Sequence, residues 1–473
     1  MKKQAPAILT VDHEARLSGG TPALAQAIKQ QLTLENPKYR DARKFGRWIG
    51  KGLQPRLHFF TEEEGVLSFP RGFANQAVLL CRHLQGESPQ INDLRRHCPP
   101  LSLEFQGRLR PYQEEALNAA LNREFGVVEA GTGSGKTVLA CALFAARRQP
   151  TIILVHTKEL LHQWGRRIEE FLGEEAGLLG DGRQEIRPLT VAIVNSARRH
   201  LEKLPQHFGQ LCVDECHRVP STLFTEVVTA FDCRFMLGLS ATAYRRDGLT
   251  RLINFYLGDP SHRINTEELQ RSGAILKASL IQRPTEFRYL YRGNYQALMQ
   301  ALTADKARNR LIAADIAREA RGVTTPHNGD RREVKGAEEE DSGSGREEGT
   351  ILVVSDRVQH CAQLAALLED LGVESRVLTG ATPTEERNEL VNELRNGKVA
   401  VLISTVQLIG EGFDCPGLRS LFLTTPIKFT GRLLQVVGRI LRPSTGKEPR
   451  VYDYVDPVGV LQYSAQSRAF TLN

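Results

Sequence analysis

The chain has 473 residues with a formal net charge of +7, and 41% of its residues are apolar, which is enough for two or three domains with buried sheets. No apolar run approaches the roughly 18 residues needed to cross a bilayer, and the polar N-terminal segment lacks a signal-peptide core, so we expect a cytoplasmic protein without membrane contact. The basic balance favours a polyanionic partner such as nucleic acid.

Residues 1–100 are predicted to form a small accessory α+β domain. The segment from Tyr39 to Trp48 interleaves basic and aromatic side chains, and Arg56 and Arg71 continue the pattern. Such a surface can follow a phosphate backbone and stack bases, which would make this a DNA-binding domain. The same aromatics can equally form the core of a compact domain with solvated cations around it, and the sequence leaves both interpretations open.

A phosphate-binding loop is predicted at Ala130–Thr137, which reads AGTGSGKT. An apolar run precedes it and a helical stretch follows, the context in which glycines turn backbone N–H groups toward phosphate at a helix N-terminus. Lys136 is expected to meet the β and γ phosphates of a nucleotide, and Thr137 to ligate Mg²⁺. The expected cradle consists of Gly131, Thr132, Gly133, Ser134 and Gly135.

Two carboxylates, Asp214 and Glu215, directly follow the apolar run Leu211–Val213. Asp214 is predicted to hold Mg²⁺ through water and Glu215 to orient or deprotonate the attacking water, the two tasks that triphosphate hydrolysis requires. The eight cysteines of the chain are scattered and form no matching set of ligands, so we do not expect them to bind a metal.

Two series of short apolar runs alternate with helical stretches, a pattern typical of parallel sheets covered on both faces. They predict an ATP-binding domain over residues 101–270 and a C-terminal domain over residues 271–473, with ATP in the cleft between them. The predicted strands are Phe125–Val128, Thr151–Val155, Val191–Val194, Gln210–Val213 and Phe235–Leu239 in the first domain, and Thr350–Val354, Ser375–Leu378, Val399–Ser404, Ser420–Thr424 and Arg450–Val455 in the second.

The second domain is interrupted by residues 324–349, which contain almost no apolar side chain and include the acidic run Glu338–Asp341. Such a segment cannot offset the entropy of ordering by burial, so we predict a disordered surface insertion. A regulatory role for it is the alternative.

Near the C-terminus, Gln435–Arg442 reads QVVGRILR. Arg439 and Arg442 lie three positions apart and therefore share one face of a helix. A planar, permanently charged guanidinium suits the charge that develops on a transferring phosphoryl group. We predict that both arginines act catalytically on the distant nucleotide; a solvated helix face is the alternative.

In this order the motifs resemble those of superfamily 2 helicases of the DEAD/DEAH type, from about Leu109 to the C-terminus. The resemblance implies two tandem RecA-like parallel-sheet domains, an α/β fold, behind the small α+β domain. The chain is most similar to XPB-like and UvsW-like DNA translocases and to the motor subunits of restriction enzymes. The residues that carry this are Asp214–His217, Leu239–Gly248, Arg308–Asn309 and Gly410–Asp414.

The same resemblance implies further site residues. Arg110 and Gln113 would belong to an adenine-reading element, and Gly412 and Asp414 would contact the nucleotide from the second domain. Ser240–Thr242 would link hydrolysis to strand binding. Backbone contacts to nucleic acid would come from Thr157, Lys158, Ser196, Ser355 and Thr405.

The function so implied is that of an ATP-dependent helicase or translocase that uses ATP and Mg²⁺ to move along DNA, in repair, recombination or defence, with protein partners in such a complex. Phosphate contacts carry no base information, so movement should not depend on sequence. Three alternatives stay open: a motor subunit of a restriction-like complex, an RNA helicase, and a non-motor clamp that ATP switches. No motif distinguishes DNA from RNA, because the 2′-hydroxyl decides that choice.

Overall fold

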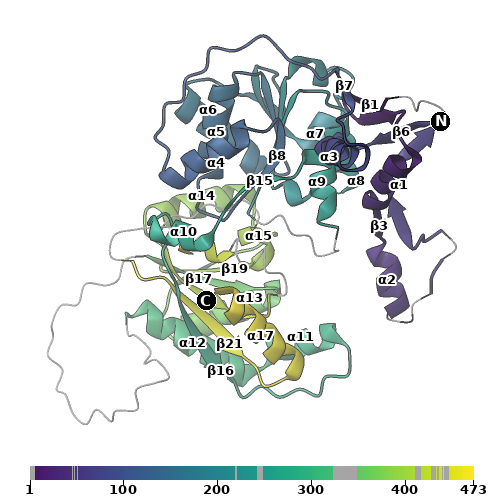
Figure 1. Cartoon of the computed structure of the whole chain (residues 1–473). Coiled ribbons are helices and arrows are strands. Elements are labelled where there is room, and N and C mark those ends of the chain that lie inside the picture. Colours follow the sequence, from purple (N-terminus) through teal and green to yellow (C-terminus); the bar gives the residue numbers. More distant parts are fainter. Residues whose placement is uncertain are drawn as a thin grey trace. The chain divides into compact units, whose positions relative to one another are not determined.

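The computed structural model describes residues 6–44, 46, 48–50, 52–218, 221–241, 249–322, 349–410, 417–427, 433, 436–438, 440–441 and 447–472. The chain divides into two compact units, Met1–Thr266 (unit 1) and Glu267–Asn473 (unit 2), each with its own sheets (Figure 1). Among the helices within these ranges, none is both long and apolar enough to span a bilayer. The predicted disordered insertion lies, apart from Gly349, outside the described residues.

Unit 1 begins with a five-stranded sheet in the order β5-β6-β2-β1-β7. Its strands β1, β2 and β6 alternate buried and half-buried positions because one face packs against helices α1 (Pro22–Gln31) and α3 (Ala74–Gln85), whereas the edge strands β5 and β7 are exposed throughout. α1 begins where Thr21 accepts a hydrogen bond from the backbone N–H of Leu24, with proline at the first helical position. The predicted α+β character of this region is confirmed. The strands are β1 (Ile8–Val11), β2 (Ala15–Ser18), β5 (Thr61–Glu63), β6 (Val66–Phe69) and β7 (Gln90–Asp93).

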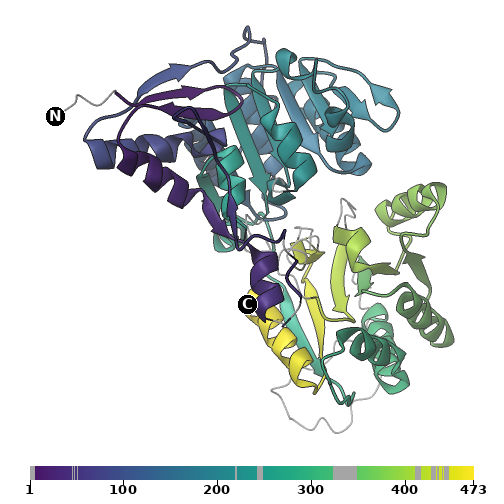
Figure 2. The same cartoon turned by 90° about the vertical axis from the view of Figure 1, so that its right-hand side faces the viewer.

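A separate two-stranded ribbon, β3 (Thr33–Glu35) with β4 (Arg56–His58), carries helix α2 (Pro37–Lys44). We call residues 33–58 the arm. Figure 2 shows the arm extending from the N-terminal sheet with α2 at its far end. Its outer surface is basic and aromatic, because Trp48 is 88% exposed and the side chains of Lys38, Arg40, Arg43 and Lys44 all face solvent.

The N-terminal sheet and the large sheet of unit 1 share one hydrophobic core. The short helix η1 (Arg71–Phe73) packs so closely on α9 (Arg251–Leu257) that a Cβ at Gly72 would lie 2.6 Å from the carbonyl oxygen of Asn254. Phe73 meets the ring of Phe255 edge to face, with centroids 5.7 Å apart. Only glycine permits this approach, so the contact fixes the N-terminal sheet against the large sheet.

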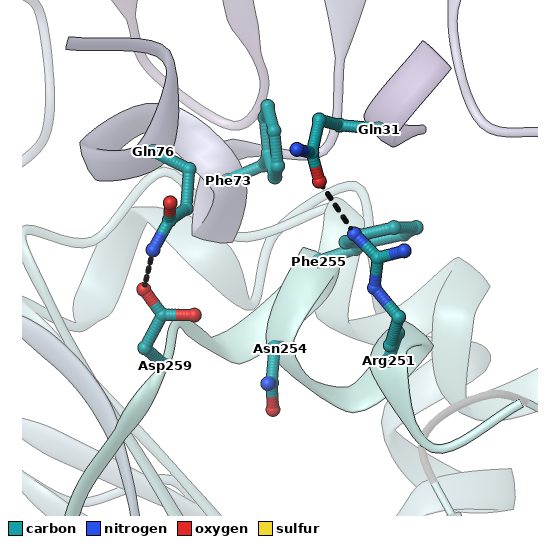
Figure 3. Close-up of a pocket in the computed structure, with 7 residues that line it drawn as sticks. All are labelled: Gln31, Phe73, Gln76, Arg251, Asn254, Phe255 and Asp259. Carbon is teal, nitrogen blue, oxygen red and sulfur yellow. Dashed lines mark hydrogen bonds between the residues drawn. The ribbon is translucent and has the colours of Figure 1, made fainter. Parts of the chain in front are cut away.

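Polar bonds surround that aromatic contact (Figure 3). Gln76 Nε2 donates to Asp259 Oδ2 at 2.6 Å, and Arg251 Nη2 donates to Gln31 Oε1 at 2.7 Å. These four side chains, the two rings and Asn254 line a cavity of about 200 Å³. The bonds join the N-terminal elements to α9 through Arg251 and to the residue just before β15 through Asp259.

The large sheet of unit 1 has eight strands in the order β11-β10-β12-β9-β13-β14-β8-β15, all parallel except β11. All five predicted strands are confirmed, and their continuous apolar runs are buried because helices cover the sheet. The strands are β8 (Phe125–Ala130), β9 (Thr151–Val155), β10 (Gly177–Gly180), β11 (Arg183–Gln184), β12 (Leu189–Ile193), β13 (Gln210–Asp214), β14 (Phe235–Ser240) and β15 (Pro260–Ile264). The helices are α4 (Pro111–Leu121), α5 (Lys136–Arg147), α6 (Lys158–Leu172), α7 (Val194–Arg198), α8 (Thr222–Thr229) and α9, with the short η3 (Cys216–Arg218).

Unit 2 contains a six-stranded, wholly parallel sheet in the order β16-β21-β20-β17-β19-β18. The five predicted strands of this unit are confirmed as well. The strands are β16 (Ser279–Pro284), β17 (Thr350–Ser355), β18 (Ser375–Leu378), β19 (Val401–Thr405), β20 (Leu418–Leu423) and β21 (Arg450–Val455). The helices are α10 (Thr266–Arg271), α11 (Tyr295–Ala304), α12 (Lys306–Ala320), α13 (Val358–Asp370), α14 (Thr384–Arg395), α15 (Val406–Gly410) and α17 (Gly459–Leu472).

Candidate nucleotide and nucleic-acid site

The candidate residues of unit 1 follow the carboxyl ends of neighbouring parallel strands. Across the sheet the order is β12, β9, β13, β14, β8. Ser196 and Thr157 follow the first two strands, Asp214 and Ser240 end the next two, and the phosphate loop follows the last. Since strands are spaced by about 4.8 Å, these residues lie along one edge of the sheet. The candidate nucleic-acid residues lie on one side of Asp214, which we call the nucleic-acid half, and the candidate nucleotide residues lie on the other, the nucleotide half.

The phosphate loop runs from the end of β8 into α5. Gly133 and Gly135 have φ angles of 89° and 77°, and a Cβ at Gly135 would lie 2.4 Å from Gln113 Nε2. Both glycines are therefore required by the loop's geometry. Lys136 is the first residue of α5, and its Nζ donates to the backbone carbonyl of Ala130 at 3.0 Å. The ammonium is thus held inside the loop.

Gln113 joins the start of α4 to this loop. Its Oε1 accepts from the backbone N–H of Arg110 at 2.9 Å, and its Nε2 donates to the carbonyl of Ser134 at 2.9 Å. Tyr112 also donates to that carbonyl, at 3.1 Å. Each end of the amide keeps one further hydrogen-bonding position, so Gln113 lies against the loop with capacity left for a base edge.

The two carboxylates lie at the end of β13 in different surroundings. Asp214 Oδ2 accepts from the indole Nε1 of Trp164 at 2.8 Å, and Oδ1 accepts from the backbone N–H of Glu215 at 2.9 Å. Glu215 itself has a φ of 50°, a left-handed conformation that is uncommon for a residue with a side chain and is typical of strained functional positions. Its Oε2 lies 3.2 Å from His217 Nδ1, which is also 3.2 Å from Ser240 Oγ.

The surroundings move the pKa values of the two carboxyls apart. Burial raises the pKa of Asp214, and the adjacent charge of Glu215 raises it further. Burial acts in the same direction on Glu215, but the hydrogen bond with His217 and the charge of Lys136 outweigh it and lower the pKa of Glu215 below its usual value. Glu215 therefore remains ionised, as a group that accepts a proton from water must be.

The residues fit a nucleotide with Mg²⁺. Ser134 Oγ is buried inside the loop and, within the described part of the chain, has no hydrogen-bond partner. A buried hydroxyl without a partner is rare and indicates that a ligand atom completes the site. Lys136 and Thr137 follow Ser134 at the N-terminus of α5, and the charge of Lys136 acts on the carboxyl of Asp214. The hydroxyl of Thr137 and the carboxylate of Asp214 are oxygen donors of the kind that Mg²⁺ prefers.

On the nucleic-acid half, Thr157 caps α6 by accepting from the backbone N–H of Leu160 at 3.3 Å. The exposed Lys158 contacts Asp181, with 2.5 Å between Nζ and Oδ1, and His162 Nε2 lies 2.9 Å from the other oxygen. These two partners, His162 first, lower the pKa of Asp181. The sequence analysis missed Asp181, although its place in a Gly-Asp-Gly turn was a visible signal of an exposed side chain.

Ser196 lines a cavity of about 220 Å³ between α7 and the β10–β11 turn, together with two arginines, Arg183 and Arg199, and with His200. The cations, the hydroxyl and the exposed backbone of Gly182 provide donors that suit a phosphate. The carboxylate of Asp181, which pairs with Lys158 and His162, lines the same cavity. The cavity lies on the same sheet edge as Thr157, so unit 1 brings these two candidates together.

In unit 2, Ser355 and Thr405 end the neighbouring strands β17 and β19. Ser355 is fully buried, and its Oγ lies 2.9 Å from His360 Nδ1 and accepts from the backbone N–H of Arg357. Burial lowers the pKa of His360 to about 3, so the ring is neutral. The Ser355 hydroxyl thus organises its own loop, and the adjoining backbone is the part that can face a ligand.

Four candidates, Gly412, Asp414, Arg439 and Arg442, lie outside the described residues, as does the segment from Thr242 to Gly248. Their roles stay predictions. The described residues bring together Arg110, Gln113, the phosphate loop, Asp214 and Glu215 in unit 1.

Two families match the chain. Residues 106–245 match the family described as "Type III restriction enzyme, res subunit", and residues 339–444 match "Helicase conserved C-terminal domain". Together they cover most of the predicted motifs of both units.

Relatives and solved structures agree with these matches. A protein named DNA 3'-5' translocase XPB2, from Sulfurisphaera tokodaii, is 28% identical over 358 residues, which cover 71% of this chain and 78% of the relative. Probable helicase D10 of Escherichia phage T5 is 25% identical over 335 residues, covering 70% and 67%. The structure of S. cerevisiae Dbp5 bound to RNA and ADP BeF3 has a TM-score of 0.52 at 14% identity, covering 77% of this chain and 94% of that one. The fold of two tandem RecA-like domains is confirmed.

Proposed function

We propose, from the premise that this chain belongs to the superfamily 2 helicases, that it is an ATP-hydrolysing motor that moves along DNA. The observation that supports this most is the common sheet edge in unit 1, where the phosphate loop, the Asp214–Glu215 pair and the Thr157–Ser196 region follow adjacent strands. A site of this layout can sense nucleotide and nucleic acid through the same sheet. Within the chain we propose an accessory domain at 1–100 and two motor domains at 101–270 and 271–473.

In this proposal the chain's own residues divide the chemistry. The loop N–H groups and Lys136 hold the phosphates, while Thr137 and Asp214 orient the Mg²⁺ that neutralises phosphate charge. Arg110 and Gln113 hold the base. Glu215 takes the proton of the attacking water. The second domain contributes Gly412, Asp414, Arg439 and Arg442. The two arginines stabilise the negative charge on the transferring phosphoryl group.

Nucleic acid is held through its backbone by Thr157, Lys158, Ser196, Thr405 and the loop of Ser355. We favour DNA because the XPB2 relative is named a DNA translocase and because the pattern of basic residues on the arm suits a duplex. Backbone contacts of this kind make movement independent of sequence.

The experiment that tests this function is the ATPase rate with single-stranded, duplex, forked and branched DNA and with RNA, at a fixed salt concentration. We expect DNA to raise the rate severalfold and RNA to raise it less. Stimulation by RNA alone would replace the DNA assignment with an RNA helicase. Stimulated ATPase without displacement of a third strand from a triplex would favour the ATP-switched clamp.

The match to a restriction-enzyme subunit family over residues 106–245 favours a second candidate, the motor of a restriction-like or defence complex. A nuclease would then reside on another chain. Affinity purification from the native host, followed by a nuclease assay with and without ATP, separates this candidate from a motor that acts alone in repair or recombination.

The arm gives a separate prediction. In the Arg43→Glu variant we expect weaker DNA binding. The slope of log affinity against log salt concentration should fall by about one, because one phosphate contact and its released counterion are lost. Trp48→Ala should cost about 1–3 kcal/mol of binding if the ring stacks on a base. Fluorescence anisotropy across a salt series measures both.

Arg123→Glu, the same charge reversal at an exposed position that precedes β8 and lies outside the arm, is the matched control. If the arm variants and the control bind DNA with the same affinity and the same salt slope, the arm's aromatics and cations are only a solvated surface, the alternative that the sequence left open.

A further inference from the structure

Trp164 lies in the middle of α6 and contacts two residues of the nucleotide half, Asp214 and Phe144. The side chain is 1% exposed. Its indole Nε1 donates to Asp214 Oδ2 at 2.8 Å. Its ring stacks on Phe144 of α5, the helix that begins at Lys136, with centroids 6.3 Å apart and 28° between the planes. The hydrogen bond therefore orients the indole, and the ring of Phe144 adds packing contact beside it.

The hydrogen bond fixes a carboxylate that has few other restraints. Each oxygen of Asp214 accepts one protein donor, the indole N–H on Oδ2 and the backbone N–H of Glu215 on Oδ1. A carboxylate offers about four lone-pair positions, so the remaining ones are free to accept from water bound to Mg²⁺. The two donors together set the plane of the carboxylate, and the indole is the one of them that belongs to another element, α6. Such outer partners of metal ligands typically alter metal affinity or activity by about 10–100-fold.

The same helix begins at the nucleic-acid half. Thr157 caps α6 and Lys158 is its first residue, and Trp164 follows Thr157 by seven positions, or about 10 Å along a helix. Leu161, Trp164, Ile168 and Leu172 bury one face of α6. A helix packed along its length moves as a rigid body, so a displacement at its first turn also displaces the indole.

We propose that Trp164 is a positioning residue that couples nucleic-acid binding at the start of α6 to the orientation of Asp214. This rests on the proposed function, since it assumes that Thr157 and Lys158 meet a nucleic-acid backbone. Phosphate at the first turn shifts α6, and the indole N–H carries the shift to Oδ2, which changes the plane of the carboxylate that would hold Mg²⁺ through water. Coupling between two sites is reciprocal. If DNA raises the affinity for Mg²⁺ and nucleotide by some factor, Mg²⁺ and nucleotide raise the affinity for DNA by the same factor.

The test measures binding of DNA with and without Mg²⁺ and a non-hydrolysable ATP analogue. In the wild type we expect the analogue to raise DNA affinity by a factor within about 5–150, the usual range of such coupling. In Trp164→Phe, which keeps a buried ring but has no N–H, we expect that factor to fall about tenfold or to vanish. The Mg²⁺ concentration for half-maximal analogue binding should rise about tenfold in the same variant.

Phe144→Leu is the matched control, because it removes the stacked ring and keeps the indole donor. It should lower the melting temperature while retaining the coupling factor. If Trp164→Phe does not fold, the isosteric amino acid benzothienylalanine at position 164 replaces the N–H by sulfur at unchanged shape, and should lose the coupling equally.

The outcomes separate the inference from the function on which it rests. A wild type that neither hydrolyses ATP nor binds DNA would overturn the proposed function. If the analogue raises DNA affinity in the wild type, and by the same factor in the Trp164→Phe and benzothienylalanine proteins, only the role of Trp164 would be overturned. A loss of coupling in Phe144→Leu as large as in Trp164→Phe would assign the effect to packing and would also reject the role.

Discussion

Replacing Lys136 with alanine is expected to reduce ATP turnover by at least about a hundredfold to a thousandfold, the usual effect of removing one preorganised donor from a phosphate or oxyanion site. The ammonium is held inside the loop by the carbonyl of Ala130. Its charge helps to lower the pKa of Glu215, and it opposes the rise that burial and Glu215 cause in the pKa of Asp214. The variant should lose nucleotide affinity as well as turnover, because Lys136 meets phosphate charge in the ground state and the transition state alike. Calorimetry and a phosphate-release assay measure the two quantities.

Lys203→Ala is the control for this experiment, because it removes a lysine from an exposed position of the same unit. Its turnover and melting temperature should match the wild type. If Lys136→Ala retained wild-type turnover, the loop at Ala130–Thr137 would not be the ATP site, and the whole functional assignment would fall.

Glu215→Gln should separate binding from hydrolysis. Glutamine has the same shape and can adopt the left-handed backbone that Glu215 shows, but it cannot take a proton from water. We expect turnover to fall about a hundredfold to ten-thousandfold, the usual contribution of a general base, while ATP affinity stays within about threefold. Single-turnover hydrolysis and equilibrium binding of ATP measure the two effects independently.

The matched exchange for Glu215→Gln is Glu174→Gln at an exposed position, for which we expect wild-type rates. A Glu215→Gln enzyme that hydrolyses ATP at near the normal rate would assign the base to another group. A large loss of ATP affinity would instead indicate that Glu215 binds the nucleotide complex directly.

The central strands were predictable because burial on both faces leaves continuous apolar runs. Thr151–Val155 and Arg450–Val455 match β9 and β21 to the residue. The edge strands β15 and β16 were missed for the converse reason. Their sequences, PSHRI and SLIQRP, place polar side chains at positions that only one neighbouring strand covers, and no periodic signal distinguishes them from loops.

The site was predictable where a short motif carries its own chemistry. The phosphate loop and the Asp214–Glu215 pair need particular residue types in consecutive positions, so the sequence alone locates them. The contacts of Trp164 with Asp214 and of Lys158 with Asp181 join residues far apart in the chain. Such pairs depend on how α6 packs on β10 and β12 and on where the β10–β11 turn ends, which only the folded chain determines.

The glycine contact between η1 and α9 has a mechanical consequence. Since the N-terminal sheet and the large sheet share one core, and a side chain at Gly72 would collide with the backbone of α9, the base of the arm has no hinge relative to the phosphate loop. Any rotation that the large sheet makes during a nucleotide cycle therefore also moves the N-terminal sheet from which the arm extends.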